Sequence, residues 1–428
     1  MSQRRPPAEM HRAAHLWWLH PGRMVMLGLM PLYLAIASFD FARVVKNVYV
    51  PSAMYLFGVV LIAAMGLGIA AATVHAPPRA VPRDPPMVST GTMLMLLALT
   101  MMAYVVWLGP VAMRPSLLVE IWRGQRAELR DDLSTSPGLT TLTQLGVAYV
   151  IAYAIKCGAG IQRVSMAERV GFWLVMLLAV LRAFAWAERL AVLELLVCWV
   201  VARLAYLPIH SASGWRMASV APAFAPVAVY LAFTASEYFR SWEYYVDQYD
   251  SIWGFTLDRL LTYYATAVNN GVGLLADLTG WPFFEGGYLF KWLHRTPVLG
   301  DLFTASLGNT RPIDNDWLAR FARPEFNSPS AYFRFVLDVG FLGSVLFVLL
   351  LGWLIGRAWI GFRLGYRSGL LTYPMWVLFL LESIRYNYLA ESRFVPLALG
   401  LVILALDMRR QDALRQMGGP ASAAVGAR

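Results

Sequence analysis

The sequence predicts an all-α, polytopic integral membrane protein with about ten transmembrane helices and a helical loop outside the membrane. Of its 428 residues, 58% are hydrophobic and only 14% are charged. The mean hydropathy is +0.54, far from the values of soluble domains. Apolar runs long enough to cross about 30 Å of hydrocarbon recur up to residue 407. Only residues 236–332 form a long stretch without such a run.

Ten apolar segments account for the predicted transmembrane helices, and nine to twelve such helices are compatible with the sequence. The fifth and sixth segments are separated only by Glu188 and Arg189, so their connection is the shortest. The segments are 24–39, 52–75, 91–111, 139–156, 170–186, 190–209, 218–235, 333–356, 370–386 and 394–407.

The distribution of Lys and Arg predicts that both chain ends face the cytoplasm. With the N-terminus inside, the cytoplasmic tails and loops hold about twice as many Lys and Arg residues as the short outer loops. The net charge of +10 therefore reflects membrane topology, because no contiguous basic face indicates nucleic-acid binding. The predicted parts are an N-terminal transmembrane bundle (1–235), a large periplasmic loop (236–332), C-terminal transmembrane helices (333–407) and a cytoplasmic tail (408–428).

Aromatic residues run through the large loop, as in "EYFRSWEYYVDQYDSIWGF" (237–255) and across 278–294. Two interpretations compete. Tyr and Trp gather at membrane interfaces, so a half-sunk platform would have this composition. They also offer sugar rings an apolar face together with a hydroxyl or indole donor.

Apolar positions at helical spacing, among them Tyr264, predict a helix between these aromatic stretches. The triplet Asn269-Asn270-Gly271 interrupts that pattern. We expect it to stop or kink the helix, or to expose two amide side chains to a hydroxyl-rich ligand.

Charged side chains inside apolar segments form three clusters. A charge at the bilayer centre costs about 2.5–3.5 kcal/mol on insertion scales, so it persists mainly where it pairs, reaches the interface or serves function. The first cluster is "RAFAWAERLAVLE" (182–194), where Arg182 and Arg189 share a face if the helix is continuous. Glu188 and Glu194 are placed to neutralise them. The alternative is an ion-paired tight turn between two helices.

The second cluster is "ESIRYNYLAESR" (382–393). In a continuous helix, Glu382, Arg385 and Arg393 would fall close to one face.

The third cluster lies within 328–343, where Arg334 and Asp338 are spaced to pair across one helical turn. The predicted topology puts all three clusters at the outer ends of their helices. They therefore indicate either one site for a polyanion at the outer leaflet or three separate structural ion pairs.

Four stretches resemble, in the same order, signature regions of the bacterial repeat-unit polymerases that build O-antigen, capsule and exopolysaccharide. They are "RAFAWAERLAVLE", "YYATAVNNG", "EFNSPSAYFRFVLDVGFLG" and "LESIRYNYLAESRFVP", within about residues 170–400. Members of that family are multi-pass inner-membrane proteins with a large periplasmic loop, related to type-C glycosyltransferases. The resemblance implies transfer of a growing glycan from undecaprenyl pyrophosphate to the sugar end of the next lipid-linked unit.

The clusters and the resemblance together assign roles to individual residues. Arginines suit the pyrophosphate, whose negative charge grows as it leaves, and a carboxylate suits the base that accepts the acceptor's proton. The expected pyrophosphate-binding residues are Arg182, Arg189, Arg385 and Arg393. The candidate bases are Glu325, which comes first, and Asp338. The expected sugar-binding residues are Tyr264, Asn270 and Asn327, and the expected ion-pair residues are Glu188, Glu194, Arg334 and Glu382.

The expected partners are an undecaprenyl pyrophosphate-linked oligosaccharide, membrane lipids, and a chain-length regulator and flippase of the same pathway. We expect no cofactor, metal or nucleic acid. Three other functions stay open: a ligase that moves glycan from the same lipid to another acceptor, a polysaccharide transporter or flippase, and a non-catalytic assembly subunit or receptor. A transporter would line a mid-membrane path with its charges, whereas a polymerase would gather them at the outer rim.

Overall fold

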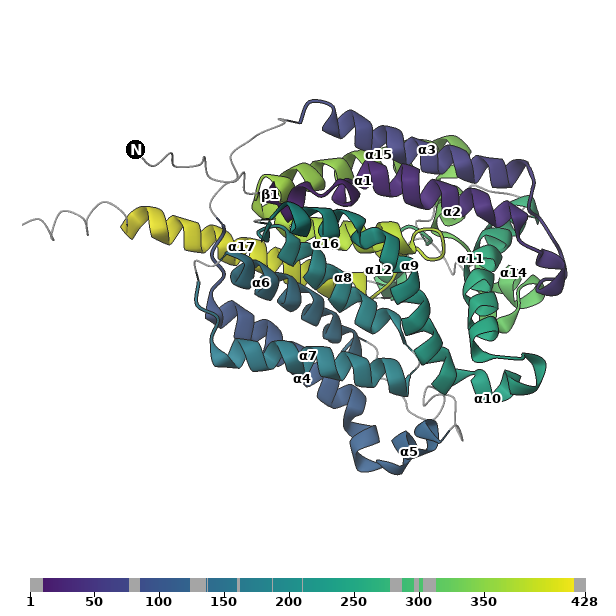
Figure 1. Cartoon of the computed structure of the whole chain (residues 1–428), viewed down its shortest axis with the longest axis horizontal. Coiled ribbons are helices and arrows are strands. Elements are labelled where there is room, and N and C mark those ends of the chain that lie inside the picture. The colour runs from purple at the N-terminus through teal and green to yellow at the C-terminus, as the bar shows by residue number, and fades with distance from the viewer. Residues whose placement is uncertain are drawn as a thin grey trace, which may run out of the picture.

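The computed structural model describes residues 11–76, 85–123, 136, 138–159, 162–186, 188–209, 211–277, 287–295, 300–302 and 313–418. This part of the chain is almost entirely helical. The only strands in this part of the chain form a two-residue antiparallel pair between β1 (His11–Arg12) and β2 (Pro208–Ile209). Most of the long helices lie side by side along the molecule, and α11 runs across its right-hand end in Figure 1. Parts of the predicted loop and tail, including 278–286 and 419–428, lie outside the described residues.

The helices before the large loop are α1 (Pro21–Arg23), α2 (Met30–Ala35), α3 (Ala53–Thr73), α4 (Thr90–Met113), α5 (Ser116–Trp122), α6 (Leu145–Ala159), α7 (Met166–Ala185), α8 (Leu190–Leu204) and α9 (Ala212–Arg240). Those of the loop and beyond are α10 (Trp242–Tyr245), α11 (Ile252–Asp277), α12 (Lys291–Arg295), α14 (Ile313–Phe321), α15 (Ala331–Arg363), α16 (Arg367–Glu382) and α17 (Phe394–Gly418). The short turns used below are η8 (Pro324–Phe326) and η9 (Tyr388–Ala390).

Each of the ten predicted apolar segments is largely helical in the structure. Within the described residues, five helices are long and apolar enough to cross a membrane: Pro21–Ser38, Ala53–Thr73, Thr90–Met113, Ala212–Arg240 and Ala331–Arg363. Helices α6, α8 and α16 are shorter, α7 carries charges near both ends, and α17 carries them in its C-terminal half. The count of ten spans therefore stays a prediction, whereas a helical membrane protein agrees with the structure.

Large apolar side chains cover the outward faces of the long helices. Leu67, Val105, Leu177 and Leu342 are examples, each more than 60% exposed. Water-soluble monomers rarely expose so much contiguous apolar surface. These faces are suited to contact lipid.

Helices α3 and α15 pack with their backbones in contact. A Cβ atom at Gly68 would collide with the carbonyl oxygen of Leu349, and one at Gly352 would collide with that of Met65. Small residues at such crossings let transmembrane helices approach closely. The two glycines therefore set the spacing of this pair.

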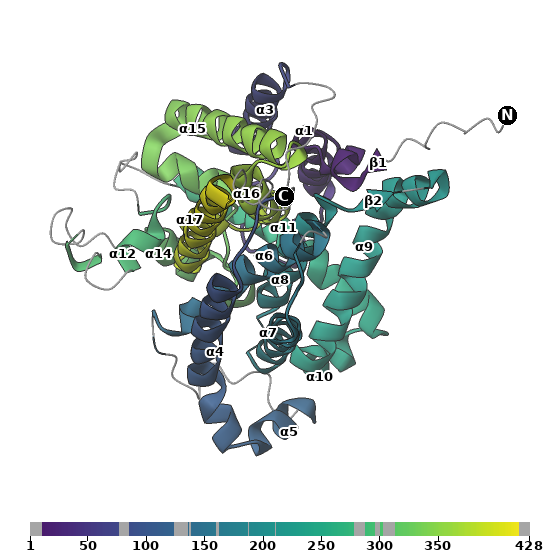
Figure 2. The ribbon, with the colours of Figure 1, turned by 90° about the vertical axis from the view of Figure 1, so that its left-hand side faces the viewer.

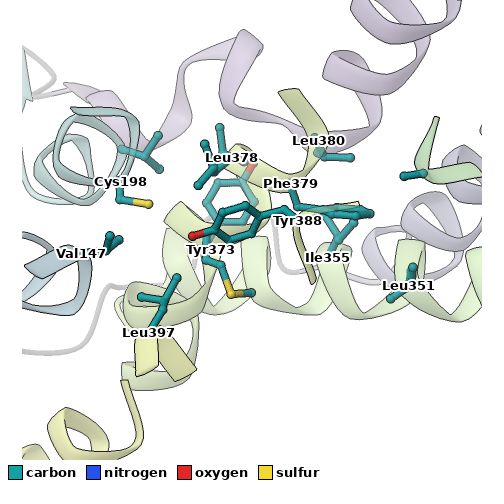
Figure 3. Packing of buried hydrophobic residues seen from close by; sticks show 14 of the residues in the cluster. Val147, Cys198, Leu351, Ile355, Tyr373, Leu378, Phe379, Leu380, Tyr388 and Leu397 are labelled. Carbon is teal, nitrogen blue, oxygen red and sulfur yellow. The ribbon is translucent and has the colours of Figure 1, made fainter. Parts of the chain in front are cut away.

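Helix α16 lies at the centre of the core, between α8 and α15. Cys198 of α8, Val147 of α6, and Tyr373 and Leu378 of α16 belong to one buried cluster, part of which is drawn in Figure 3. Tyr388, which follows α16, is fully buried in the same cluster. The polar segment after α16 is thus anchored by its apolar neighbours.

Helix α15 is divided by a kink at Gly340, whose φ of 72° is typical of glycine. A straight helix of its 33 residues would be about 50 Å long, more than a bilayer core needs. The part before the kink lies between α11 and α16. The amide of Ser330 donates to the carbonyl of Ala267 at 3.0 Å, and that of Ala331 donates to the carbonyl of Ser383 at 3.2 Å.

The two ends of the bundle differ. The end facing the viewer in Figure 2 holds the β1–β2 pair and the last turns of α17. There the amide of Ser89, which caps α4, donates to Asp407 of α17 at 2.8 Å. The ends of α7, α9 and α16 reach the opposite end, where α11 crosses (Figure 1). The first and last described residues therefore lie at one end, and the charged clusters lie at the other.

Candidate functional site

The first predicted cluster is a tight turn between two helices. Helix α7 ends at Ala185 and α8 begins at Leu190, so Arg182 and Arg189 do not share a continuous helix. Arg182 is 3% exposed. Its Nε donates to Glu188 Oε2 at 2.8 Å, and its guanidinium carbon lies 3.6 Å from the centre of the Trp107 ring. These contacts hold Arg182 inside the bundle.

Arg189 and Arg259 share one fully buried carboxylate, that of Glu237 at the end of α9. Arg259 Nε lies 2.8 Å from Glu237 Oε2. The same guanidinium donates through Nη1 to Glu325 Oε2 at 2.8 Å. Arg259 thus links the end of α9 to the turn η8, which carries Glu325.

Two further arginines are held by buried glutamates. Arg393 Nη1 donates to Glu194 Oε1 at 2.8 Å, and Arg385 Nη2 donates to Glu382 Oε2 at 2.7 Å. Arg385 and Arg393 follow the last residue of α16 and precede the first of α17, so no continuous helix joins them as the sequence suggested. They nevertheless line the same cavity.

This arginine cavity has a volume of about 370 Å³. Its wall contains polar side chains from α9, α11, η8 and the segments beside α8 and α16. They are Glu188, Arg240, Tyr263, Glu325, Arg385 and Arg393. Arg182 and Arg189 are not among the residues that line the cavity. The cavity is therefore reached by two of the four predicted pyrophosphate-binding arginines, and by Arg240.

Arg240 differs from the other arginines of the site. Among the described residues, no carboxylate lies within ion-pair distance of it, and its Nη1 donates to the hydroxyl of Tyr263 at 3.3 Å. The side chain is half-buried. Its positive charge is therefore available to an anion in the cavity.

Tyr263 lies among the guanidiniums. Burial acts to raise the pKa of its phenol, but four arginines outweigh that effect and the net pKa lies below the ordinary value of 10.0. They are Arg240, Arg189, Arg259 and Arg385. A second tyrosine of the loop behaves in the opposite way, since burial and a hydrogen bond to Asp258 raise the pKa of Tyr249 to about 12. The field at Tyr263 favours negative charge.

The segment 324–328 separates three cavities. Glu325 and Phe326 border both the arginine cavity and a second cavity of about 750 Å³, the tyrosine cavity, which contains Tyr245 and Tyr249. Asn327 and Ser328 border the arginine cavity and a third, also of about 750 Å³, the lysine cavity, which contains Lys291 and Glu391. The predicted residues Glu325 and Asn327 thus lie where cavities meet.

Several predicted residues have other positions. Asp338 is 1% exposed, and its Oδ2 accepts from the backbone amides of Tyr288 at 2.9 Å and Leu289 at 2.6 Å. It borders none of the three cavities, so its geometry is that of a structural residue, not a base. The expected ion pair between Arg334 and Asp338 does not form among the described residues, and Arg334 Nη1 lies 3.8 Å from Glu391 Oε1.

The tandem asparagines do not interrupt α11, which continues to Asp277. Asn269 and Asn270 are each 2% exposed, and Asn270 Nδ2 donates to the carbonyl of Phe326 at 2.7 Å. The amide of Asn270, which was expected to bind sugar, is therefore buried and donates to a backbone carbonyl instead. Tyr264 packs against the hydrophobic core, and its neighbour Tyr263 lines the cavity instead.

Four residues of this site, Glu237, Arg240, Arg259 and Tyr263, were not predicted from the sequence as site residues. Glu237 and Arg240 follow directly after an apolar segment, as the charges of the recognised clusters do. Arg259 and Tyr263 are one helical turn apart, with Thr266 and Asn270 further along the same face. This stripe was a detectable signal, but which face of α11 meets the arginines depends on tertiary packing.

The arrangement is chemically suited to bind an anion beside a carboxylate, in a cavity at one end of a helical membrane protein. Comparison of the chain with protein-family models, with curated protein sequences and with solved structures finds no match.

Proposed function

We propose that this protein is a membrane-embedded glycosyltransferase that polymerises a lipid-linked oligosaccharide. It would move the growing glycan from undecaprenyl pyrophosphate to the sugar end of the next lipid-linked unit. The observation that carries the proposal is the cavity whose wall combines the guanidiniums of Arg240, Arg385 and Arg393 with the exposed carboxylate of Glu325. The second carboxylate of that wall, Glu188, is paired with Arg182. The substrate class comes from the resemblance of the surrounding stretches to repeat-unit polymerases.

Arginines at this position would stabilise the leaving group. The acceptor oxygen forms a bond to the anomeric carbon as the bond from that carbon to the phosphate oxygen breaks. The electron pair of the broken bond stays with the pyrophosphate, so negative charge grows there in the transition state. Guanidiniums already fixed in a low-dielectric cavity stabilise such charge with little reorganisation.

Glu325 is the residue placed to accept the proton of the attacking hydroxyl. Its side chain is 46% exposed, in contrast to the buried Asp338. Oε2 accepts from Arg259 at 2.8 Å and Oε1 accepts from the hydroxyl of Tyr245 at 2.9 Å. These bonds orient the carboxylate, while each oxygen keeps a lone pair for a substrate hydroxyl.

The positions of the charges favour transfer chemistry over transport. The arginines of the cavity lie at or beyond the ends of α9 and α16 and before α17, instead of along a path through the bundle. We therefore assign the arginine cavity to the periplasmic face of the inner membrane, with ten spans and both termini in the cytoplasm. In this orientation, the pyrophosphate and its lipid would enter from the outer leaflet.

Polymerisation by the purified protein tests the proposal. The protein is reconstituted in lipid nanodiscs with undecaprenyl pyrophosphate-linked repeat unit, and products are separated by size. We expect a ladder of polymer from the wild type and only single units from Arg385→Ala and Glu325→Gln. Arg367→Ala is the matched control, because Arg367 lies at the other end of α16 and pairs with Asp412 at 3.0 Å.

Each failure has a distinct meaning. No ladder from the folded wild type would refute the polymerase. A normal ladder from both site variants would refute the assignment of the residues. Transfer to a different lipid acceptor, without a ladder, would instead identify a ligase.

A further inference from the structure

The tyrosine cavity lies across Glu325 from the arginine cavity. Its volume of about 750 Å³ falls in the range of small-molecule sites, about 300–1,000 Å³. It is lined by residues of α10, α11 and η8, of the segments directly before α11 and η8, and of the segment after α2. The function proposed above assigns no ligand to it. Those that matter here are Arg43, Tyr245, Tyr249, Asp258, Arg259 and Arg323.

The aromatic rings of this cavity are held rigidly. Phe255 is 2% exposed, with the ring of Tyr245 stacked at 5.1 Å and that of Tyr249 edge-on at 5.3 Å. Both tyrosine hydroxyls are fixed as well. Tyr245 donates to Glu325 at 2.9 Å, and Tyr249 donates to Asp258 at 2.8 Å. A ligand that meets these rings therefore needs little reordering of side chains, which lowers the entropic cost of binding.

The charges of the cavity are mixed. Guanidiniums of Arg43, Arg259 and Arg323 border it together with the carboxylates of Asp258 and Glu325. Such a lining offers both donors and acceptors at the edge of an aromatic surface. A hydroxyl-rich ring with apolar faces matches this combination better than a polyanion does.

We propose that the tyrosine cavity binds the acceptor saccharide and presents one of its hydroxyls to Glu325. This inference rests on the proposed polymerase function. Glu325 borders both cavities, so a hydroxyl reaching it from the tyrosine side meets the anomeric carbon of a donor whose pyrophosphate lies on the arginine side. The proton of that hydroxyl passes to Glu325, its oxygen forms the glycosidic bond, and the pyrophosphate departs with the electron pair.

A soluble acceptor separates this cavity from the donor site. The probe is free repeat-unit oligosaccharide released by mild acid from the host's own lipid-linked intermediate. It has lost its pyrophosphate and can act only as an acceptor. Its contact with the nanodisc-embedded protein is measured by saturation-transfer NMR, and its KM is measured with lipid-linked unit as donor.

The variants are chosen to keep the fold. Tyr249→Ala removes a ring of the cavity, and Tyr249→Phe keeps the ring and its packing on Phe255. Tyr244→Ala removes a 60% exposed tyrosine of α10 that is outside the cavity. We expect Tyr249→Ala to lose the saturation-transfer signal and to raise the acceptor KM roughly tenfold, with little change in kcat. Tyr249→Phe is expected to retain most of the binding, and Tyr244→Ala all of it.

The results distinguish the two proposals. Polymer formation with an acceptor KM and NMR signal unchanged by Tyr249→Ala overturns the saccharide site and leaves the polymerase standing. A Tyr249-dependent signal without any transfer supports the saccharide site and refutes the polymerase. Absence of a signal from the wild type at millimolar probe overturns the site.

Discussion

Replacing Arg240 with glutamine is expected to weaken pyrophosphate binding without unfolding the protein. No carboxylate among the described residues pairs with this guanidinium, and Tyr263 is its hydrogen-bonding neighbour at 3.3 Å. The substitution therefore leaves no buried carboxylate without its ion-pair partner. Arg393→Gln would do so, because Glu194 is 1% exposed and losing one member of a buried ion pair costs about 3–5 kcal/mol of stability.

The magnitude follows from the contact that would be lost. A hydrogen bond to a charged group contributes about 1.5–3 kcal/mol, which corresponds to roughly a 10- to 150-fold change in an equilibrium constant. We expect the affinity for undecaprenyl pyrophosphate, and the rate of transfer, to fall within this range. Arg240→Lys should restore part of the loss, since it keeps the charge but not the planar fork.

The assay uses nanodisc-embedded protein, with lipid pyrophosphate binding measured by thermophoresis and polymer formation measured by gel. Arg216→Gln is the control, an exposed arginine on the same helix about 36 Å away at 1.5 Å per residue. Equal affinity and rate for the two glutamine variants, both folded, would refute the view that Arg240 provides uncompensated charge to the site.

Three other predictions concern the electrostatics and packing. Tyr263→Phe should remove a tyrosinate transition with a midpoint below pH 10 from the ultraviolet titration, because nearby arginines lower the pKa of this phenol. The prediction fails if the transition that the variant loses has its midpoint at or above pH 10. Glu168→Gln should lower the thermal midpoint and cost about 3–5 kcal/mol, since it leaves buried Lys156, now 2.6 Å from Glu168, without its carboxylate; an unchanged midpoint would show that the pair adds nothing. Gly352→Ala should destabilise the fold whereas Gly109→Ala, with open space around it, should not; equal midpoints would argue against backbone contact between α3 and α15.

The positions of the helices were predictable because lipid and core select the same apolar residues. Every predicted segment is helical, since a run of Leu, Val, Ala and Phe in such a chain has few alternatives. The boundaries and bends of the helices were harder to predict from the sequence. The kink at Gly340 depends on the packing of α15 against α11 and α16. A single glycine in an apolar run does not by itself predict a kink.

The candidate site was predictable only in part. Arg385 and Arg393 stood out because an apolar segment rarely carries such charges, and both line the cavity. The tandem asparagines looked suited to bind sugar, yet Asn270 bonds to a backbone carbonyl of η8. Arg240 could not be predicted from the sequence. It differs from the other arginines in having no carboxylate partner among the described residues, and only the fold shows which charged side chains lie close together.

The short segment 324–328 is a common wall (partition) between the arginine, tyrosine and lysine cavities, the three chambers of this site, and this has a thermodynamic consequence. If a ligand in one chamber restricts the partition, it changes the affinity of the neighbouring chambers, and reciprocity requires the effect to be equal in both directions. In such an enzyme, the affinity for one substrate would depend on whether the other substrate is already bound. The order in which the two substrates bind would then depend on five residues that belong to no helix of the membrane bundle.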